Sequence, residues 1–341
     1  MGVKQAQQTG NQGRGRSAER PEEIPARGWW DITWRVIQDL GNDNVSLVAA
    51  GMAMYALLSV FPGLAAAVSI YGMFATPTDV AHQMSAFAGV LPPGVWDIFK
   101  SELAHITSRQ QDTLSVAAAI GVLLALWSAR SAMSSLMTAT NIAYKEREKR
   151  SFVRQVLVSL ALTVGAVIGF LLILLIGVAV PVGLRLLGTA AWVQTVGAVV
   201  RWIVLYAFAV CALALVYRYA PAREPAKWHW LSWGSTIAAL LWLGASVLFA
   251  VYVRNFASYG VTYGTLGGVV VLLMWFYISG YVVVLGVEIN AEMERQTVKD
   301  TTEGPPAPMG ERGAYAADTV GPPAGKPDRD APPKDQAIRN R

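Results

Sequence analysis

The chain has 341 residues, of which 54% are hydrophobic and only 15% are charged, and its formal net charge is +5. Soluble domains contain about 25% charged residues, and here the charges are concentrated in residues 1–45, 145–154 and after 292. These values exclude an ordinary soluble domain and indicate a polytopic membrane protein, in which the modest positive charge is more typical of cytoplasmic loops than of a nucleic-acid site.

The N-terminal part divides into two predicted segments. Residues 1–28 are rich in Gln, Gly, Arg, Glu and Pro, which predicts a disordered arm. Residues 29–43 place Trp30, Trp34 and Ile37 near one helical face. Because tryptophans favour the headgroup region of a bilayer, we predict an interfacial helix here.

Residues 44–295 form the predicted transmembrane domain, a six-helix bundle. A helix of about 20 residues covers about 30 Å, the thickness of the hydrocarbon core. The six apolar stretches long enough to cross it lie within 44–78, 114–144, 155–184, 196–217, 228–253 and 265–290. Pro62 is expected to kink or break the first of them.

The basic residues alternate between successive segments outside these stretches. From the N-terminal arm onward, Lys and Arg number six, two, five, one, three and one. Cytoplasmic loops carry the excess of basic residues, so both termini are predicted to be cytoplasmic. The loop of about residues 75–112 is then external, and apolar residues at helical spacing between Pro92 and Ile106 predict an amphipathic extracytoplasmic helix there. Residues 296–341, rich in Pro, Gly and mixed charge, are predicted to be a disordered cytoplasmic tail.

Four blocks of the sequence resemble a known family. They are "AAGMAMYALLSVFPGL" (49–64), "LWSARSAMSSLMTATNIAY" (126–144), "YRYAPAREPAKWHWLSWGS" (217–235) and "YGTLGGVVVLLMWFYISGYVVVLGVEINAE" (263–292). In this order they resemble the YihY/BrkB family of bacterial inner-membrane proteins, over about residues 40–295. The sequence departs from the family's more polar pattern at Met54 and Ala56. The resemblance implies a six-helix bundle in the bacterial inner membrane, whereas members have carried labels as different as ribonuclease BN, virulence factor and transporter.

The residues themselves argue against the ribonuclease label. Metal-dependent RNA cleavage needs clustered His and Asp ligands, and the chain has three histidines, His82, His105 and His229, with no metal-ligand spacing. The predicted topology separates the first two from the third across the membrane. We therefore expect no catalytic residues, no metal ligands, no cofactor and no nucleic-acid partner.

Polar residues inside the apolar stretches form the candidate site. A charged side chain at the bilayer centre costs about 2.5–3.5 kcal/mol on insertion scales, so it usually has a partner or lines a cavity. Arg130 and Glu288 are both predicted to lie toward the cytoplasmic half of the membrane, with polar residues on the same helical stripes or one turn apart. The candidate residues are Arg130, Glu288, Asn141, Ser134, Tyr55, Ser59 and Tyr281.

Three interpretations of Arg130 and Glu288 remain open at this point. In the first, Glu288 ends its helix in the headgroups and Arg130 extends its side chain to the interface. In the second, the two residues form a structural ion pair. In the third, they belong to a substrate or proton site. Two functions remain open as well. One is a transporter or lipid-handling protein with a small-molecule or lipid substrate, and the other is a non-catalytic scaffold or an envelope factor associated with virulence. Membrane lipids are expected partners in both, and the sequence does not define the oligomeric state.

Overall fold

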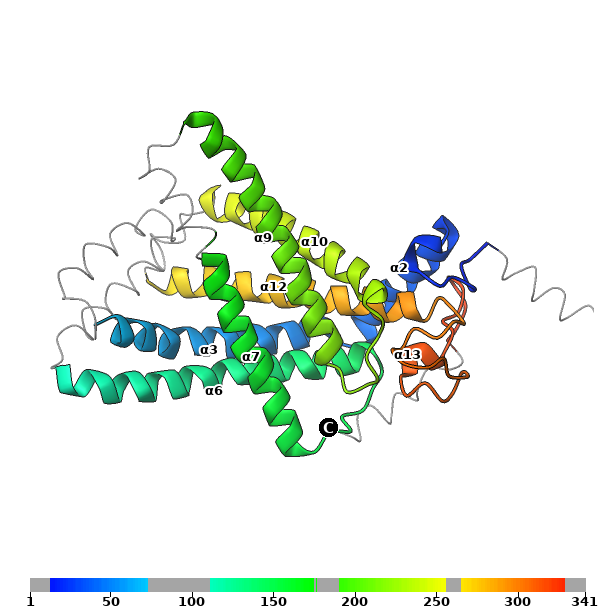
Figure 1. Ribbon diagram of the computed structural model, residues 1–341, viewed down its shortest axis with the longest axis horizontal. Coiled ribbons are helices and arrows are strands. Elements are labelled where there is room, and N and C mark those ends of the chain that lie inside the picture. Colours follow the sequence, from blue (N-terminus) through cyan, green and yellow to red (C-terminus); the bar gives the residue numbers. More distant parts are fainter. Residues whose placement is uncertain (1–12, 73–110, 175, 177–189, 256–264, 329–341) are drawn as a thin grey trace, which may run out of the picture. The chain divides into compact units, whose positions relative to one another are not determined.

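The computed structural model describes residues 13–72, 111–174, 176, 190–255 and 265–328. Over these residues the fold is all-α, without a strand, and Ala226 and Thr302 form an isolated bridge. The helices, shown in Figure 1, are η1 (Pro21–Glu23), α2 (Ala26–Asn42), α3 (Val45–Gly72), α6 (Gln111–Ala143), α7 (Phe152–Leu174), α9 (Ala191–Tyr219), α10 (Trp228–Asn255), α12 (Thr265–Glu294) and α13 (Tyr315–Asp318).

Six of these helices are long and apolar enough to cross a membrane, as the sequence predicted. They are α3, α6, α7, α9, α10 and α12. Helix α3 continues through Pro62 to Gly72, so this proline lies inside the helix and does not end it. The predicted extracytoplasmic helix at 92–106 lies outside the described residues.

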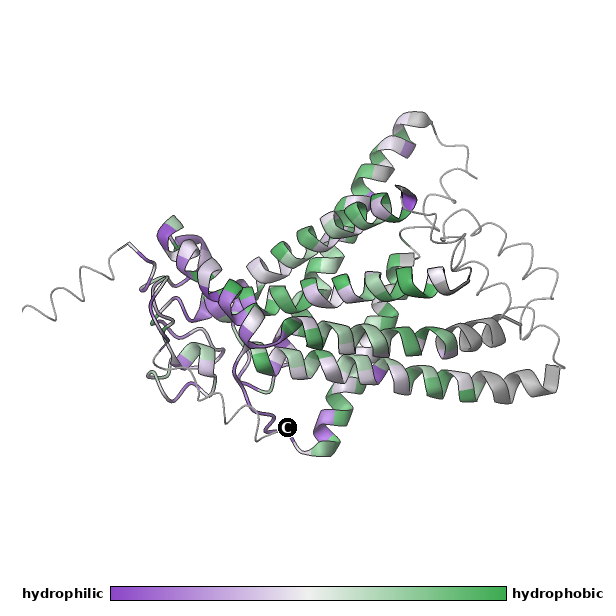
Figure 2. Cartoon of the chain, turned by 180° about the vertical axis from the view of Figure 1, so that it is seen from behind, coloured by the Kyte–Doolittle hydropathy of each residue, from purple (hydrophilic) through white to green (hydrophobic). Residues whose placement is uncertain are grey.

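Helices α7 and α9 show how composition produces these elements. From Val156 to Leu174, α7 contains only apolar and small polar residues, and its hydroxyl groups bond back to the helix, as Thr163 does to the carbonyl oxygen of Ser159 at 2.7 Å. Large apolar side chains point outward, with Leu171 57% exposed and Trp202 59% exposed. Figure 2 colours most residues of both helices as hydrophobic, and such exposed apolar helices suit a lipid environment and would be unusual in water.

The chain packs as two units. Unit 1 comprises Met1–Ser46, Met137–Leu241 and Val282–Arg341, and unit 2 comprises Leu47–Leu136 and Trp242–Tyr281. Within unit 2, α12 approaches α3 closely, because Gly280 lies against the backbone of Ala49. The indole nitrogen of Trp242 on α10 also donates a hydrogen bond to the hydroxyl group of Ser279 on α12, at 2.9 Å.

Unit 1 contains a core of buried side chains. Its buried apolar cluster joins α2 to the start of α10 and the end of α12, through Ala18, Ile24, Ile32, Val36, Trp230 and Met293. Helices α10 and α12 touch at Gly234, whose backbone N–H donates to the side-chain oxygen of Asn290 at 3.0 Å. A Cβ atom at this glycine would lie 2.2 Å from that oxygen, so the contact requires glycine.

Parts of both predicted disordered segments make specific contacts in the structure. Arg16 donates to the carbonyl oxygen of Gly321 at 2.6 Å, and Thr297 donates to that of Ala18 at 2.7 Å. Composition predicts disorder where little apolar surface can be buried, but these segments are joined by hydrogen bonds to backbone carbonyl groups instead. Residues 1–12 and 329–341 lie outside the described residues, and the prediction of disorder stands untested there.

Candidate functional site

Helix α2 lies along the last turns of α12, and its sequence determines which side chains face that helix. Ile32 and Val36 are 1% and 4% exposed in the apolar cluster of unit 1. Residues three, four and seven positions apart share a helical face. Asp39 and Asp43 therefore continue the buried stripe of Ile32 and Val36 toward the C-terminal end of α2.

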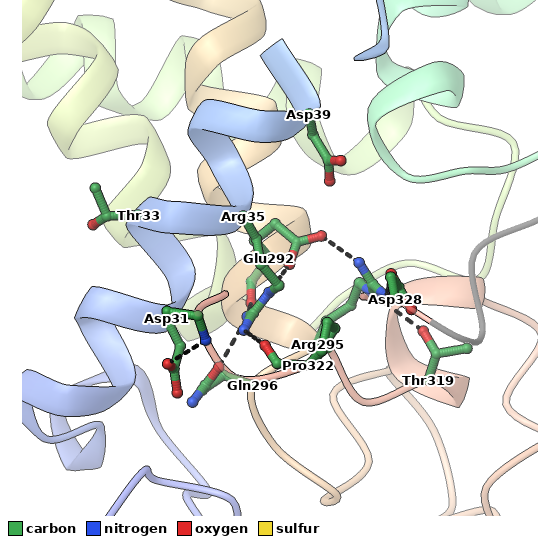
Figure 3. Close-up of polar contacts among 12 residues, drawn as sticks. Asp31, Thr33, Arg35, Asp39, Glu292, Arg295, Gln296, Thr319, Pro322 and Asp328 are labelled. Carbon is green, nitrogen blue, oxygen red and sulfur yellow. Dashed lines mark hydrogen bonds and ion pairs between the residues drawn. The ribbon is translucent and has the colours of Figure 1, made fainter. Parts of the chain in front are cut away.

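An ionic network joins α2, α12 and the C-terminal segment. The Arg35 guanidinium forms an ion pair with Glu292 and donates to the backbone oxygen of that residue at 2.9 Å. From the other side, Arg295 donates to Glu292 at 2.6 Å and to Asp328 at 2.5 Å, as Figure 3 shows. The side chains of Arg35, Glu292 and Arg295 are at most 4% exposed. Burying them is tolerable because every charge has an oppositely charged partner.

Lys145 extends this network to the carboxyl group of Asp39. It follows the end of α6, and its ammonium group lies 3.3 Å from Asp39 and 4.0 Å from Asp328. Burial raises the pKa of the Asp39 carboxyl, although the Lys145 ammonium opposes this shift. Burial and Arg295 lower the pKa of Lys145, but the carboxylates of Asp39 and Glu292 outweigh them, so that pKa is raised.

Three carboxyl groups meet beside this network, and we call Asp39, Asp43 and Glu288 the carboxylate cluster. One oxygen atom from each lies within 4.8 Å of the other two. The Glu288 side chain is 0% exposed, and among the described residues neither of its oxygen atoms has a hydrogen-bond partner. Buried carboxylates without a hydrogen-bond partner are rare because desolvation is expensive. The carboxylate cluster is therefore the candidate functional site.

The burial of Glu288 also bears on the interpretations drawn from the sequence. A carboxylate that merely ends its helix in the headgroups would be accessible, and Glu288 is not. Arg130 belongs to unit 2 and Glu288 to unit 1, and the predicted ion pair between them stays a prediction. Within unit 2, the Arg130 guanidinium lies 5.4 Å from the ring centre of Trp127, the residue three positions before it in α6.

Asn141 makes contacts that connect loops within unit 1. Its side-chain oxygen accepts the backbone N–H of Ala222 at 2.7 Å, and its side-chain nitrogen donates to Glu148 at 3.1 Å. Both groups of the amide are therefore used to hold the segment after α6 against the loop between α9 and α10. This arrangement favours a structural role for Asn141.

The remaining predicted site residues lie in unit 2. Ser59 donates to the carbonyl oxygen of Ala56 at 2.6 Å within α3. The rings of Tyr281 and Tyr277 on α12 have their centres 6.3 Å apart. Tyr55 is 43% exposed, and Ser134 is half-buried on α6. These four residues belong to unit 2, whereas Glu288 belongs to unit 1.

Sequence reasoning missed the groups that surround Glu288. The prediction of an interfacial helix over residues 29–43 did not single out Asp39 and Asp43, although their four-residue spacing places two carboxylates on one face. The spacing from Glu288 to Glu292 gives the same signal on α12. Pairing the two stripes required the tertiary contact between α2 and α12, which the helical spacing alone does not contain.

The fold and the site define the class of this protein as an all-α, multi-pass membrane protein with a buried polar cluster at the end of one membrane-crossing helix. Comparison with known proteins identifies its family. A family model described as "Virulence factor BrkB" matches residues 36–310, and the chain belongs to this family.

The individual relatives carry two kinds of name. YfkH of Bacillus subtilis, whose name describes it as ribonuclease-like, is 31% identical over 258 residues, which cover 73% of this chain and 90% of that protein. A UPF0761 membrane protein of Tolumonas auensis is 24% identical over 281 residues, covering 81% of this chain and 87% of the relative. A further UPF0761 membrane protein, from Alteromonas mediterranea, is 26% identical over 269 residues, with 77% and 87% covered. No solved structure matches the chain.

Proposed function

We propose that this protein is a transporter or lipid-handling protein of the bacterial inner membrane. In this proposal the Glu288 carboxyl group takes part in binding or moving an ion, a proton or the substrate. One observation carries the proposal: a carboxyl side chain within a membrane-crossing helix is 0% exposed and has no hydrogen-bond partner among the described residues. Ionisable groups at such positions commonly belong to ion, proton or substrate paths. The substrate is expected to be a lipid or a small molecule.

Co-purification tests this proposal without assuming a substrate. The full-length protein would be isolated with native lipids, and the lipids and metabolites that accompany it identified by mass spectrometry. We expect at least one molecule to be enriched with the wild type and lost from Glu288→Gln. Glu311→Gln is the matched control because Glu311 is exposed in the C-terminal segment. Equal profiles for all three proteins would contradict a role for Glu288 in substrate handling.

The topology is part of the same proposal. The alternation of basic residues supports cytoplasmic termini, with Lys149 on the cytoplasmic side and Lys100 outside. Single cysteines at these two positions, in a Cys211→Ser background, would be exposed to an impermeant thiol reagent in intact cells. We expect labelling at position 100 alone, and labelling at position 149 would invert the proposed orientation.

A membrane scaffold is the second candidate, and the packing of unit 1 favours it. The end of α12 is filled by bonded side chains, since Asn290, Glu292 and Glu294 are at most 1% exposed. Glu294 is held by Arg223 at 2.6 Å. A scaffold predicts that no lipid or metabolite is enriched beyond the level of an unrelated membrane protein.

We propose no enzymatic role, despite the ribonuclease-like name of YfkH. Hydrolysis of RNA requires a phosphodiester to reach the acid, base or metal that acts on it. Glu288 has no hydrogen-bonded acid or base beside it among the described residues. RNA cleavage that co-purifies with the protein and is lost in Glu288→Gln would overturn this part of the proposal.

A further inference from the structure

The carboxylate cluster combines two independent features that together point to a ligand. The first is convergence, because Asp39 on α2, Asp43 directly after that helix and Glu288 on α12 bring one oxygen atom each to within 4.8 Å of the others. The second is that Glu288 is fully buried and both its oxygen atoms have no hydrogen-bond partner among the described residues. From these observations we infer that Asp39, Asp43 and Glu288 bind a hard divalent cation, such as Mg²⁺ or Ca²⁺.

The charges around the cluster explain why a cation is needed. Asp39 and Asp43 lie four residues apart at the C-terminal end of α2, where like charges repel and the helix dipole disfavours carboxylates. Glu288 adds a third acidic group from α12. Carboxylates that share a small volume are stable together only when a proton or a cation compensates for their repulsion.

The basic side chains nearby contact carboxylates other than Glu288, and Lys145 contacts the cluster through Asp39. Arg35 and Arg295 are bonded to Glu292, and Arg295 is also bonded to Asp328. Lys145 lies between Asp39 and Asp328. No basic side chain of the described chain lies within 4.0 Å of Glu288. Together, the side chains of the ionic network and of the carboxylate cluster contribute five carboxylates and three basic groups. Acidic groups therefore outnumber basic groups in this set of side chains, which favours binding of a cation.

The chemistry of the ligands selects the kind of cation. All three donors are carboxylate oxygens, and neither histidine nor cysteine takes part. Oxygen-only sites suit Mg²⁺, Ca²⁺ and Mn²⁺ rather than zinc or copper. Two oxygens on opposite sides of a Ca²⁺ ion at about 2.3–2.6 Å would lie about 5 Å apart, so the spread of this cluster fits one ion. Water would complete the coordination, as is usual for Mg²⁺.

This inference revises the expectation from the sequence that the chain has no metal ligands. It rests on the proposed function in one respect, since both assign Glu288 a role, but it names a ligand that can be tested without a transport assay. A bound cation would hold the C-terminal end of α2 on α12. It would thereby connect the N-terminal segment to a membrane-crossing helix.

Thermal unfolding of the purified full-length protein tests the inference. After removal of metal with a chelator, Mg²⁺ or Ca²⁺ is titrated into the wild type, Glu288→Gln, Asp43→Asn and the control Glu311→Gln. We expect the cation to raise the unfolding temperature of the wild type and the control, because a ligand that binds the folded state stabilises it. The apparent affinity should fall about tenfold or more in the two cluster variants. Whichever of Mg²⁺ and Ca²⁺ acts at lower concentration is the preferred ion.

Each other outcome has a defined meaning. If neither ion changes the unfolding temperature of the wild type, the inference is overturned. It is also overturned if the unfolding temperatures of all four proteins rise equally, which would indicate unspecific binding to detergent or lipid. If Glu288→Gln fails to fold, Asp43→Asn decides the question, because Asp43 is only half-buried. Cation binding without any co-purifying substrate would contradict the proposed function alone. A substrate that depends on Glu288 in a protein that binds no cation would contradict the inference alone.

Discussion

Helix α7 and the last turns of α12 belong to the same unit, yet they place polar and apolar groups in opposite ways. On α7, Leu157 and Leu171 are 60% and 57% exposed, and hydroxyl groups bond within the helix. On α12, Glu288 and Glu292 are at most 1% exposed. Apolar groups that face outward need only lipid, whereas buried charges need specific partners. The end of α12 is therefore where substitutions should have the strongest effects.

The largest effect is expected from Arg35→Ala. This change removes one of the two arginines that compensate for Glu292, and breaking a buried ion pair costs about 3–5 kcal/mol. Arg154→Ala is the matched control, because Arg154 is exposed at the start of α7 and an exposed charge contributes about 0–1 kcal/mol. Denaturation in detergent measures both. If the two variants lose similar stability, the end of α12 is not the more strongly stabilised region.

A smaller effect is expected where α10 packs closely against α12. Gly234→Ala would place a methyl group 2.2 Å from the side-chain oxygen of Asn290, and overpacking of this kind costs about 1–3 kcal/mol. Gly244→Ala in the same helix meets nothing within 4 Å and should be neutral or stabilising by about 0.5–1 kcal/mol. Unfolding temperatures of the two variants should therefore move in opposite directions. A stable Gly234→Ala protein would show that the two helices have room to separate.

A weaker effect, with a defined sign, is expected from Asp39→Asn in the absence of divalent cations. Burial raises the pKa of Asp39 above the ordinary value of 3.8. Its contribution to stability is therefore present below about pH 3.8 and is lost as the pH rises through the raised pKa. Relative to the wild type, Asp39→Asn should gain stability between acidic and neutral pH.

Several titratable or charged groups surround Asp39 and enter this comparison. They are Asp43, Lys145, Glu288, Glu292 and Arg295. Because Asp39 also raises the pKa of Lys145, the stability difference between the wild type and Asp39→Asn reports Asp39 together with its coupling to Lys145. A difference that stays constant with pH would contradict the raised pKa.

The smallest effect, close to zero, is expected for the coupling between Arg130 and Glu288. The ion pair predicted from the sequence and the cation site are competing explanations of how Glu288 is compensated. With Mg²⁺ present, a double-mutant cycle of Arg130→Ala and Glu288→Gln should be additive within about 0.5 kcal/mol if the cation compensates for Glu288. A coupling of about 1 kcal/mol or more would instead support the ion pair.

Much of the fold could be predicted from the sequence, because the membrane imposes a simple rule. Segments such as α7 must be apolar over about 20 residues, and this length is visible in the sequence. The candidate site was only partly predictable. Glu288 was conspicuous as a charge after an apolar run, but its neighbours Asp39 and Asp43 lie some 245 residues earlier along the chain. Their convergence depends on the packing of Ile32 and Val36, which helical spacing alone does not reveal.

The most direct test of this account is the divalent cation content of the purified protein. Full-length wild type and Glu288→Gln would be dialysed together against one buffer containing Mg²⁺ or Ca²⁺, and the metal bound to each measured by elemental mass spectrometry. The account predicts one additional equivalent of cation for each chain of the wild type compared with Glu288→Gln. Equal metal content in two folded proteins would contradict the claim that the carboxylate cluster binds a cation.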